Sequence, residues 1–174
     1  AEAAKNVGAG DVIVLKDGPW ADARLKIRAL GTAEKPVTIK AQTPGQVVFT
    51  GDSRISIAGS HVVVDGLWFQ NPRGEESIEL RIDSDELAND CRITNCAVTN
   101  DLPAADAGGS TRFVSVYGAR HRIDHCYFAG KTTQGATLVV WLADGPEAGH
   151  RIDHNHFGPR ERLGAAPHDR LRPL

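Results

Sequence analysis

Histidine, cysteine and aspartate side chains occur twice in nearly the same short pattern. Residues 120–130 read RHRIDHCYFAG and residues 149–159 read GHRIDHNHFGP. Imidazole and thiolate groups are ligands for zinc and similar ions, so His125, His154 and Cys126 raise the question of a metal site. The alternative is that one turn of a repetitive fold is copied onto the next.

The copied stretch is part of a longer repeat. Four segments align in one frame and begin at residues 63, 92, 122 and 151, so they lie 29, 30 and 29 residues apart. A constant period near 30, with short apolar segments between turn residues, is typical of a solenoid built from short strands. Further strands are expected at 11–15, 23–30, 36–41, 46–51, 77–82, 112–118 and 137–143.

Three columns of the repeat are mainly apolar. The first holds branched aliphatic residues, Val64, Ile93, Ile123 and Ile152. The second lies three residues on, with Leu67, Cys96, Cys126 and Asn155, and the third lies two further on, with Phe69, Val98, Phe128 and Phe157. Buried side chains of a flat strand are two residues apart, so the step of three requires a bend. The pattern therefore predicts interior ladders and one corner in each turn.

The residue at the bend between the first and second columns helps to decide between a stacked ladder and a metal site. It holds residue types that are enriched at positive φ, Gly66, Asn95, His125 and His154. The two histidines then lie at the corner, with Asp124 and Asp153 pointing outward beside them, whereas Cys126 points inward. A metal ion would need ligands from both sides of the wall. The spacing therefore favours a stacked ladder over a metal site.

Composition narrows the class of protein. The 174 residues suffice for one domain with a core, and 20 Lys and Arg balance 22 Asp and Glu. This balance predicts no nucleic-acid partner, and no apolar run reaches the length of a membrane span. Three cysteines form no even framework, which disfavours a disulfide scaffold.

Several stretches resemble one known family. AGDVIVLKDGPW, GTAEKPVTIKAQTPGQVVFTG, SRISIAGSHVVVDGLWFQN, RFVSVYGARHRIDHCYFAGKTTQGATLVVWL and HRIDHNHFGPR are similar, in this order, to the N-terminal half of the chondroitinase B and alginate lyase family, polysaccharide lyase family six. The resemblance spans roughly residues 9–164 and implies an all-β fold, a right-handed parallel β-helix. We expect residues 1–164 to form the N-terminal turns of one such domain, with an atypical tail at 165–174.

The resemblance also implies a reaction. Lyases of this family cleave uronate polymers by β-elimination, with calcium bound by acidic side chains and an Asn, a Lys base and an Arg acid. The implied partner is an acidic polysaccharide, alginate or dermatan sulfate, and the implied cofactor is calcium. Because such polymers occur outside the cytoplasm, a secreted or periplasmic location is expected.

The sequence departs from the family at its catalytic motifs. It contains no E-x-E-x-x-x-x-K run and no following R-H-G, since EES (75–77), ERLG (161–164) and ARHR (119–122) lack the pattern. No catalytic or metal-binding residue is therefore assigned, and the Lys base and Arg acid are expected beyond the chain end. The tail AAPHDRLRPL has no strand pattern, so we expect a solenoid truncated at its C-terminal side, with or without a shifted reading frame.

Two other functions remain open at this point. One is a non-catalytic β-helix that binds a polyanion, and the other is an inactive fragment that self-associates through the open end of the solenoid. Two loop-like stretches, 71–77 and 100–111, are expected to leave the coil and flank a groove.

Three residues are candidates for substrate binding. Tyr117 either stacks on a sugar or is an ordinary outward strand residue. Lys131 either contacts a sugar carboxylate or is a solvated lysine at a turn. Arg112 is suited to attract a polyanion. Among the remaining residues, Arg122 is expected in a solvated outward column with Arg92 and Arg151, Trp141 in the core or a groove wall, and His121, His150 and His156 at the surface.

Overall fold

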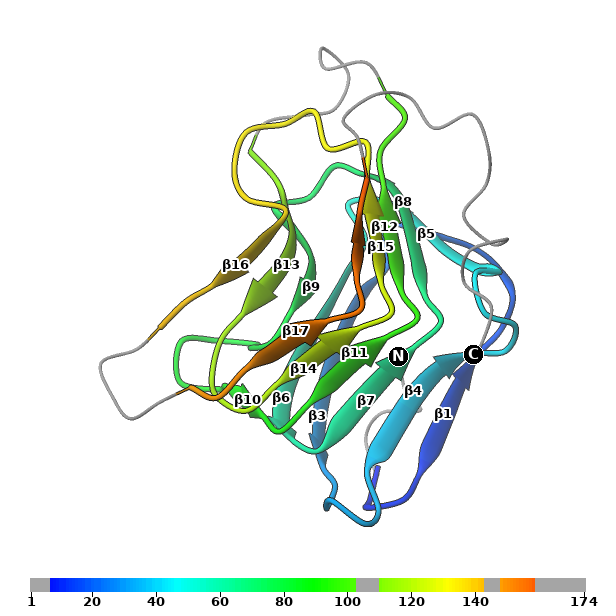
Figure 1. Cartoon of the computed structure of the whole chain (residues 1–174). Coiled ribbons are helices and arrows are strands. Elements are labelled where there is room, and N and C mark those ends of the chain that lie inside the picture. Colours follow the sequence, from blue (N-terminus) through cyan, green and yellow to red (C-terminus); the bar gives the residue numbers. More distant parts are fainter. Residues whose placement is uncertain (1–6, 103–109, 143–147, 159–174) are drawn as a thin grey trace.

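The computed structural model describes residues 7–102, 110–142 and 148–158. The chain winds into a coil whose successive turns stack, and every inter-strand pairing within the three sheets is parallel (Figure 1). The described residues contain no helix, and hence none that could cross a membrane. The prediction of an all-β parallel β-helix is therefore confirmed.

Each full turn contributes strands to three sheets. The first sheet contains β1 (Val12–Leu15), β4 (Val37–Ala41), β7 (Val62–Asp65), β11 (Arg92–Thr94), β14 (Arg122–Asp124) and β17 (Arg151–Asp153). The second contains β2 (Gly18–Ala21), β5 (Val47–Gly51), β8 (Trp68–Pro72), β12 (Ala97–Thr99), β15 (Tyr127–Ala129) and β18 (His156–Phe157). The third contains β3 (Arg24–Leu30), β6 (Arg54–Ser60), β9 (Glu76–Glu79), β10 (Ala88–Asn89), β13 (Arg112–Val116) and β16 (Leu138–Val140).

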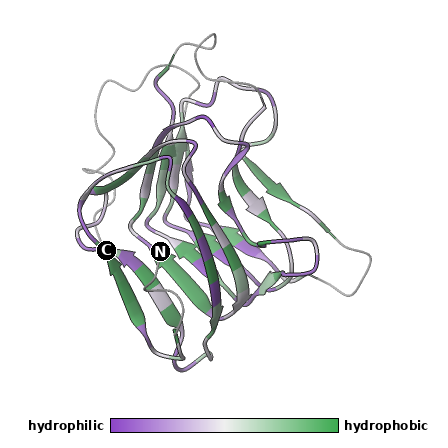
Figure 2. Cartoon of the chain, turned by 180° about the vertical axis from the view of Figure 1, so that it is seen from behind, coloured by the Kyte–Doolittle hydropathy of each residue, from purple (hydrophilic) through white to green (hydrophobic). Residues whose placement is uncertain are grey.

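The register of the first sheet follows the sequence repeat. Ile93 pairs with Val64 on one side and with Ile123 on the other, and Ile123 pairs with Ile152. Side chains of one kind therefore stack directly above one another, as the alignment of the repeats predicts. Figure 2 shows hydrophobic residues concentrated in the strands, while hydrophilic residues are frequent in the connections.

The corner between the first and second sheets lies at the predicted position in four successive turns. Gly66, Asn95, His125 and His154 have φ values of 77°, 51°, 54° and 54°. A positive φ reverses the direction of the backbone locally, which restores the inward orientation of the residue that follows. The step of three residues between interior columns is thus explained.

The interior is a ladder of apolar side chains and thiols. Cys96 and Cys126 are buried within it, and Phe49 stacks on Phe69 with ring centres 4.8 Å apart. Burial raises the pKa of the Cys96 thiol well above its usual value and that of Cys91 to about 11. Protonated thiols are poor metal ligands, which agrees with a structural role.

The loops differ from the prediction in one place. Residues 71–77 do not form a single excursion, because β8 extends to Pro72 and β9 begins at Glu76. Only residues 73–75 connect the two strands, because Glu76 pairs with Arg112 of the next turn, and Ile78 and Glu79 pair with both neighbouring turns. Most of the predicted loop 100–111, and the tail at 165–174, lie outside the described residues.

Candidate functional site

The outer surface of the third sheet carries a group of charged and aromatic side chains. Arg54, Glu79, Arg81 and Tyr117 each directly neighbour a core residue, Ile55, Ile78, Leu80 or Val116, so along an alternating strand their side chains point outward. Glu76 and Arg112 lie at the starts of β9 and β13 and join this group through ion pairs. We call this group the charged face. Its members come from β6, β9, β13 and the residues that follow β9, β13 and β16, namely Arg54, Glu76, Glu79, Arg81, Arg112, Tyr117 and Trp141.

Five of these side chains form a chain of alternating charge. Arg112 donates from Nε to Oε1 of Glu76 at 3.0 Å, and Arg54 lies 3.4 Å from Oε2 of both Glu76 and Glu79. Glu79 accepts a further hydrogen bond from Arg81 Nε at 2.9 Å. Both carboxylates are buried, and each is neutralised by two guanidinium groups. The chain carries three positive and two negative charges, so it leaves one net positive charge on this surface.

The two arginines at the ends of this chain lie against aromatic rings. The guanidinium carbon of Arg81 lies 3.8 Å from the centre of the Tyr117 ring, and that of Arg112 lies 5.8 Å from the centre of the Trp141 ring. Tyr117 and Trp141 are themselves stacked, 5.9 Å apart with an angle of 8° between the rings. Such contacts hold each guanidinium in place while its edge remains able to bind carboxylates.

Exposure shows which part of the charged face a ligand can reach. The Trp141 side chain is 44% exposed, whereas Tyr117 is partly covered, and burial raises the pKa of its phenol. An aromatic ring with one free face beside guanidinium groups is suited to bind a sugar ring that carries an acidic substituent. Trp141 is therefore more exposed than a core residue, and part of its surface is open to solvent beside Arg112.

Two serine hydroxyls on the same strands lack partners. Within the described residues, Ser77 Oγ and Ser115 Oγ are buried and form no hydrogen bond. Ser115 pairs with Glu79 in the strand register and so lies beneath the charged face. Unsatisfied buried hydroxyls are uncommon in folded proteins, and these two lie on β9, which carries the buried carboxylates of the charged face, and on β13, which carries Arg112.

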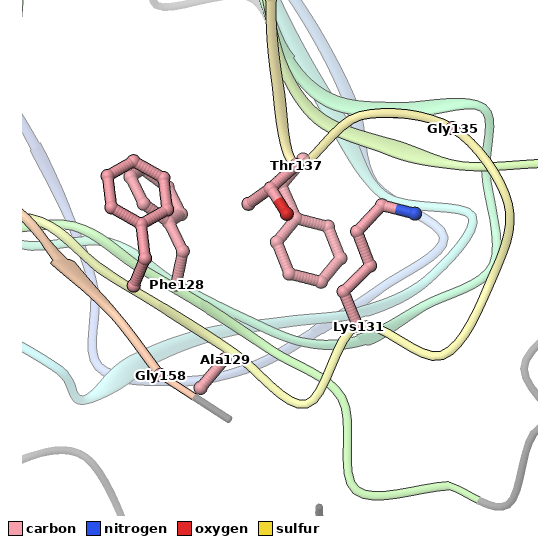
Figure 3. Close-up of a pocket in the computed structure, with 8 residues that line it drawn as sticks. Phe128, Ala129, Lys131, Gly135, Thr137 and Gly158 are labelled. Atoms are coloured by element: carbon pink, nitrogen blue, oxygen red, sulfur yellow. The ribbon is translucent and has the colours of Figure 1, made fainter. Parts of the chain in front are cut away.

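The three substrate-binding candidates predicted from the sequence do not all lie in one site. Arg112 and Tyr117 both belong to the charged face. Lys131 instead lines a cavity of about 200 Å³ together with Phe128, Thr137 and Gly158 (Figure 3). The alternative that Lys131 is a solvated lysine is wrong, because its side chain is buried.

The ammonium group of Lys131 stabilises its own loop. It donates to the carbonyl oxygens of Thr133 and Gln134 at 2.8 and 2.9 Å, and to Thr133 Oγ1 at 2.9 Å. Two carbonyl oxygens and a hydroxyl accept hydrogen bonds from the ammonium group, and these bonds offset the cost of burying its charge.

The arginines of the outward column are paired with aspartates and remain partly exposed. Arg92 binds Asp124 with hydrogen bonds of 2.9 and 2.6 Å, and Arg122 binds Asp153 at 3.2 and 3.1 Å. Asp124 points outward as predicted, yet it is completely buried because these arginines cover it. The arginines form the predicted outward ladder and stay partly exposed, but each of Arg92 and Arg122 is also paired with an aspartate of the next turn.

The duplicated histidines form a ladder. The rings of His125 and His154 stack with centres 5.2 Å apart, and each Nδ1 lies within 3.0 Å of the preceding aspartate, Asp124 or Asp153. In the part of the chain that the structure describes, no three His, Cys, Asp or Glu side chains are placed to hold a metal ion. The structural interpretation of the repeated stretch is confirmed.

Comparison with known proteins places this geometry in a family. The family model for chondroitinase B matches residues 1–172. The chain belongs to the chondroitinase B family. It is also similar to solved structures of polysaccharide lyase family six. No curated protein matches the sequence.

Two solved structures are similar at more than 30% identity. The alginate lyase AlyGC of polysaccharide lyase family six is 31% identical over 90% of this chain, with a TM-score of 0.77. A mannuronic-acid-specific family six lyase from human gut microbiota is 32% identical over 92% of this chain, with a TM-score of 0.80. The chain covers only 24% and 38% of these two proteins, respectively. A family six alginate lyase in complex with a trisaccharide is 21% identical, with a TM-score of 0.72, and supports the fold.

The residues found here and missed from the sequence are Arg54, Glu76, Glu79 and Arg81. Each is a common surface type with no short motif around it. The sequence repeat does not align them, because Glu79 and Ser115 are 36 residues apart whereas the repeat has a period of 29 or 30, and only the strand register pairs these two residues.

Proposed function

We propose that this chain belongs to a lyase that cleaves a uronate polymer, alginate, by calcium-assisted β-elimination, and that its charged face binds the polymer. Similarity above 30% to an alginate lyase and to a mannuronic-acid-specific lyase supports the substrate. The observation that carries the binding role is the half-exposed Trp141 ring beside Arg112. Degradation of such a polymer also favours a location outside the cytoplasm.

The chemistry sets requirements that the described residues do not meet. Calcium would neutralise the uronate carboxylate and so make the C5 proton more acidic. The buried carboxylates of Glu76 and Glu79 do not fit a calcium ion, because two arginines already engage each of them. We therefore assign no metal ligand, base or acid to these residues, and we assign elimination to residues of the whole enzyme outside this sequence.

Binding is the step that this chain can perform by itself. Glu76 engages Nε and Nη2 of Arg112, so the Nη1 group is the part of this guanidinium left for a sugar carboxylate, and the exposed part of Trp141 is available to the sugar ring. A non-catalytic β-helix that binds an acidic polysaccharide would use the same surface, and this is the second candidate function. The two functions differ only in whether the polymer is cut.

An assay of product formation separates the two functions. The chain is incubated with alginate and with dermatan sulfate, in calcium and in chelator, and the ultraviolet absorbance of unsaturated uronate is followed. We expect no product from the 174-residue chain but retention on alginate in affinity electrophoresis. Trp141→Ala should weaken that retention, whereas Leu142→Ala, a neighbouring exposed apolar residue, should not. Product formation by the chain would contradict the assignment of catalysis to other residues, and equal retention of both variants would contradict the binding site.

A further inference from the structure

His121 is buried at the end of the turn that follows the charged face. The turn runs from Tyr117 to His121 and connects β13 to β14. The sequence predicts a surface histidine here, yet only 1% of the residue is exposed. A fully buried imidazole must satisfy both of its nitrogens within the protein.

Both ring nitrogens of His121 have partners, and these fix its protonation state. Nδ1 accepts the backbone N–H of Cys91 at 3.1 Å, and Nε2 lies 2.7 Å from the carbonyl oxygen of Tyr117. The N–H of Cys91 can only donate and the carbonyl of Tyr117 can only accept. The ring is therefore neutral, with its single proton on Nε2.

The neighbouring turn holds the ring from the other side. The ring of His150 stacks on that of His121, with centres 5.2 Å apart and an angle of 8°, and His150 Nδ1 accepts the backbone N–H of His121 at 3.2 Å. Cys91, His121 and His150 occupy equivalent positions in three successive turns, 30 and 29 residues apart. The imidazole is thus fixed along the axis of the coil as well as within its own turn.

The hydrogen bond to Tyr117 is the contact that matters for the charged face. Gly118 follows directly, has a φ of 78°, and passes so close to β10 that an added Cβ would meet the carbonyl oxygen of Ala88 at 1.8 Å. The backbone on both sides of the Tyr117 carbonyl is therefore tightly confined. Any displacement of that carbonyl would shift the Tyr117 ring from its position between Arg81 and Trp141.

We propose that His121 is a positioning residue whose neutral ring holds Tyr117 in the charged face, so that acid releases Tyr117 and weakens the binding of uronates. The proposal rests on the binding role given above for the charged face. Protonation would place a second N–H on Nδ1, directly opposite the N–H of Cys91. Two donors would then face each other in a buried site, and a hydrogen bond would be lost.

The surroundings of His121 offer little to stabilise a positive charge. Burial is the main cause that lowers the pKa of His121 to about 4, and His150 contributes in the same direction. Burial also lowers the pKa of His150. The nearby carboxylate, Asp90, is engaged by two hydrogen bonds of 2.7 Å from Arg120, and the Cys91 thiol has a raised pKa. The ring therefore stays neutral at ordinary pH.

The experiment compares pH profiles of binding. Dissociation constants for a mannuronate oligosaccharide are measured from pH 7 to 4 for the wild-type chain, His121→Gln and His121→Leu. Gln cannot titrate, and its amide can both accept from Cys91 and donate to Tyr117. Between pH 7 and pH 4 the affinity of the wild type should fall about fivefold to tenfold more than that of His121→Gln. This extra loss corresponds to one buried hydrogen bond. His121→Leu should bind weakly at every pH.

A matched control and a ligand-free measurement complete the design. His61→Gln removes a histidine two turns earlier, in the adjacent column that holds Asp90 and Arg120, and should keep the wild-type profile. The near-ultraviolet circular dichroism of the Tyr117–Trp141 pair, taken as the difference from Tyr117→Leu, reports the stack without any sugar. This signal should decline near pH 4 in the wild type but persist in His121→Gln.

The two readouts separate the proposal from the function on which it rests. Identical binding profiles of wild type and His121→Gln, or a stack signal unchanged through pH 4 in the wild type, would overturn the role of His121. A wild-type chain that binds no oligosaccharide at pH 7 would contradict the binding function. In that case the decline of the stack signal, present in wild type and absent in His121→Gln, would still support the positioning role.

Discussion

Arg92 and Asp124 join neighbouring turns of the coil through two hydrogen bonds, Nε to Oδ1 at 2.9 Å and Nη2 to Oδ2 at 2.6 Å. Arg122 and Asp153 repeat this relation one turn later. Asp124 is completely buried, so the guanidinium groups make its charge tolerable. Charged side chains on the outside thus connect the same turns that apolar columns connect on the inside.

Asp124→Asn should therefore destabilise the coil. The substitution removes the charge that accepts two hydrogen bonds from Arg92, and because Arg92 itself is 42% exposed we expect a loss of about 2 kcal/mol in the free energy of unfolding, measured in urea at pH 7. Asp52→Asn is the matched control, because Asp52 pairs with Arg24 where both side chains are exposed. The expected loss there is below about 1 kcal/mol. Equal losses in the two variants would contradict a special role for the buried pair.

The same pair predicts a dependence of stability on pH. Burial by itself would raise the pKa of Asp124, but the hydrogen bonds from Arg92 outweigh it, and the pKa lies below its ordinary value. The folded state thus binds the proton less readily than the unfolded state. The stabilisation is present above the unfolded pKa of about 3.9 and is lost as the pH falls below it. Asp124→Asn should lack this part of the acid-induced decline.

Arg112→Lys tests whether the geometry of the guanidinium, and not only its charge, is needed. A lysine ammonium is a single point charge, so it cannot reproduce both the two hydrogen bonds to Glu76 and the contact of a planar group with the Trp141 ring. The dissociation constant for a uronate oligosaccharide should rise about tenfold. Arg24→Lys, which makes the same substitution at an exposed arginine, should leave binding unchanged. An unaltered constant for Arg112→Lys would show that charge alone suffices.

Gly118→Ala should be among the most damaging small substitutions. The φ of Gly118 is 78°, and a Cβ would lie 1.8 Å from the carbonyl oxygen of Ala88, so the backbone of β10 or β13 must move. We expect a loss of at least about 3 kcal/mol in the free energy of unfolding. Gly18→Ala isolates the backbone term, because φ is 121° but no atom lies within 4 Å of the added Cβ. That control should cost about 1 kcal/mol, and a similar cost at Gly118 would contradict the close approach.

The repeat made the fold predictable from sequence. A solenoid stacks identical positions, so one alignment determines the strand order, the register and the corner at Gly66, Asn95, His125 and His154. Burial was less predictable. His121 and Asp124 belong to types that are usually exposed, and they are covered here by side chains of adjacent turns, which a single-turn pattern does not contain.

The binding site was predicted only in part, for a related reason. Tyr117 and Arg112 are recognisable as an aromatic and a cationic residue on an outward strand. Their partners Glu76, Glu79 and Arg81 lie about 36 residues earlier in the chain, and the strand register alone brings them together. The burial of Lys131 depends on the path of its loop, which the sequence around it does not specify.

Self-association is expected because the final described turn exposes residues of the interior columns. Ile152 and Phe157 are 40% and 55% exposed, and β17 and β18 each pair with a described strand on one side only. Apolar side chains beside unpaired strand edges favour association with another chain. Light scattering of the 174-residue chain should detect oligomers, and Ile152→Lys combined with Phe157→Lys should reduce them. Val12→Lys with Val14→Lys makes the same change at β1, the opposite edge of the first sheet, which also pairs on one side only. Oligomers that persist in this variant but not in the first would assign association to β17 and β18. A monomer at all concentrations would contradict association through this edge.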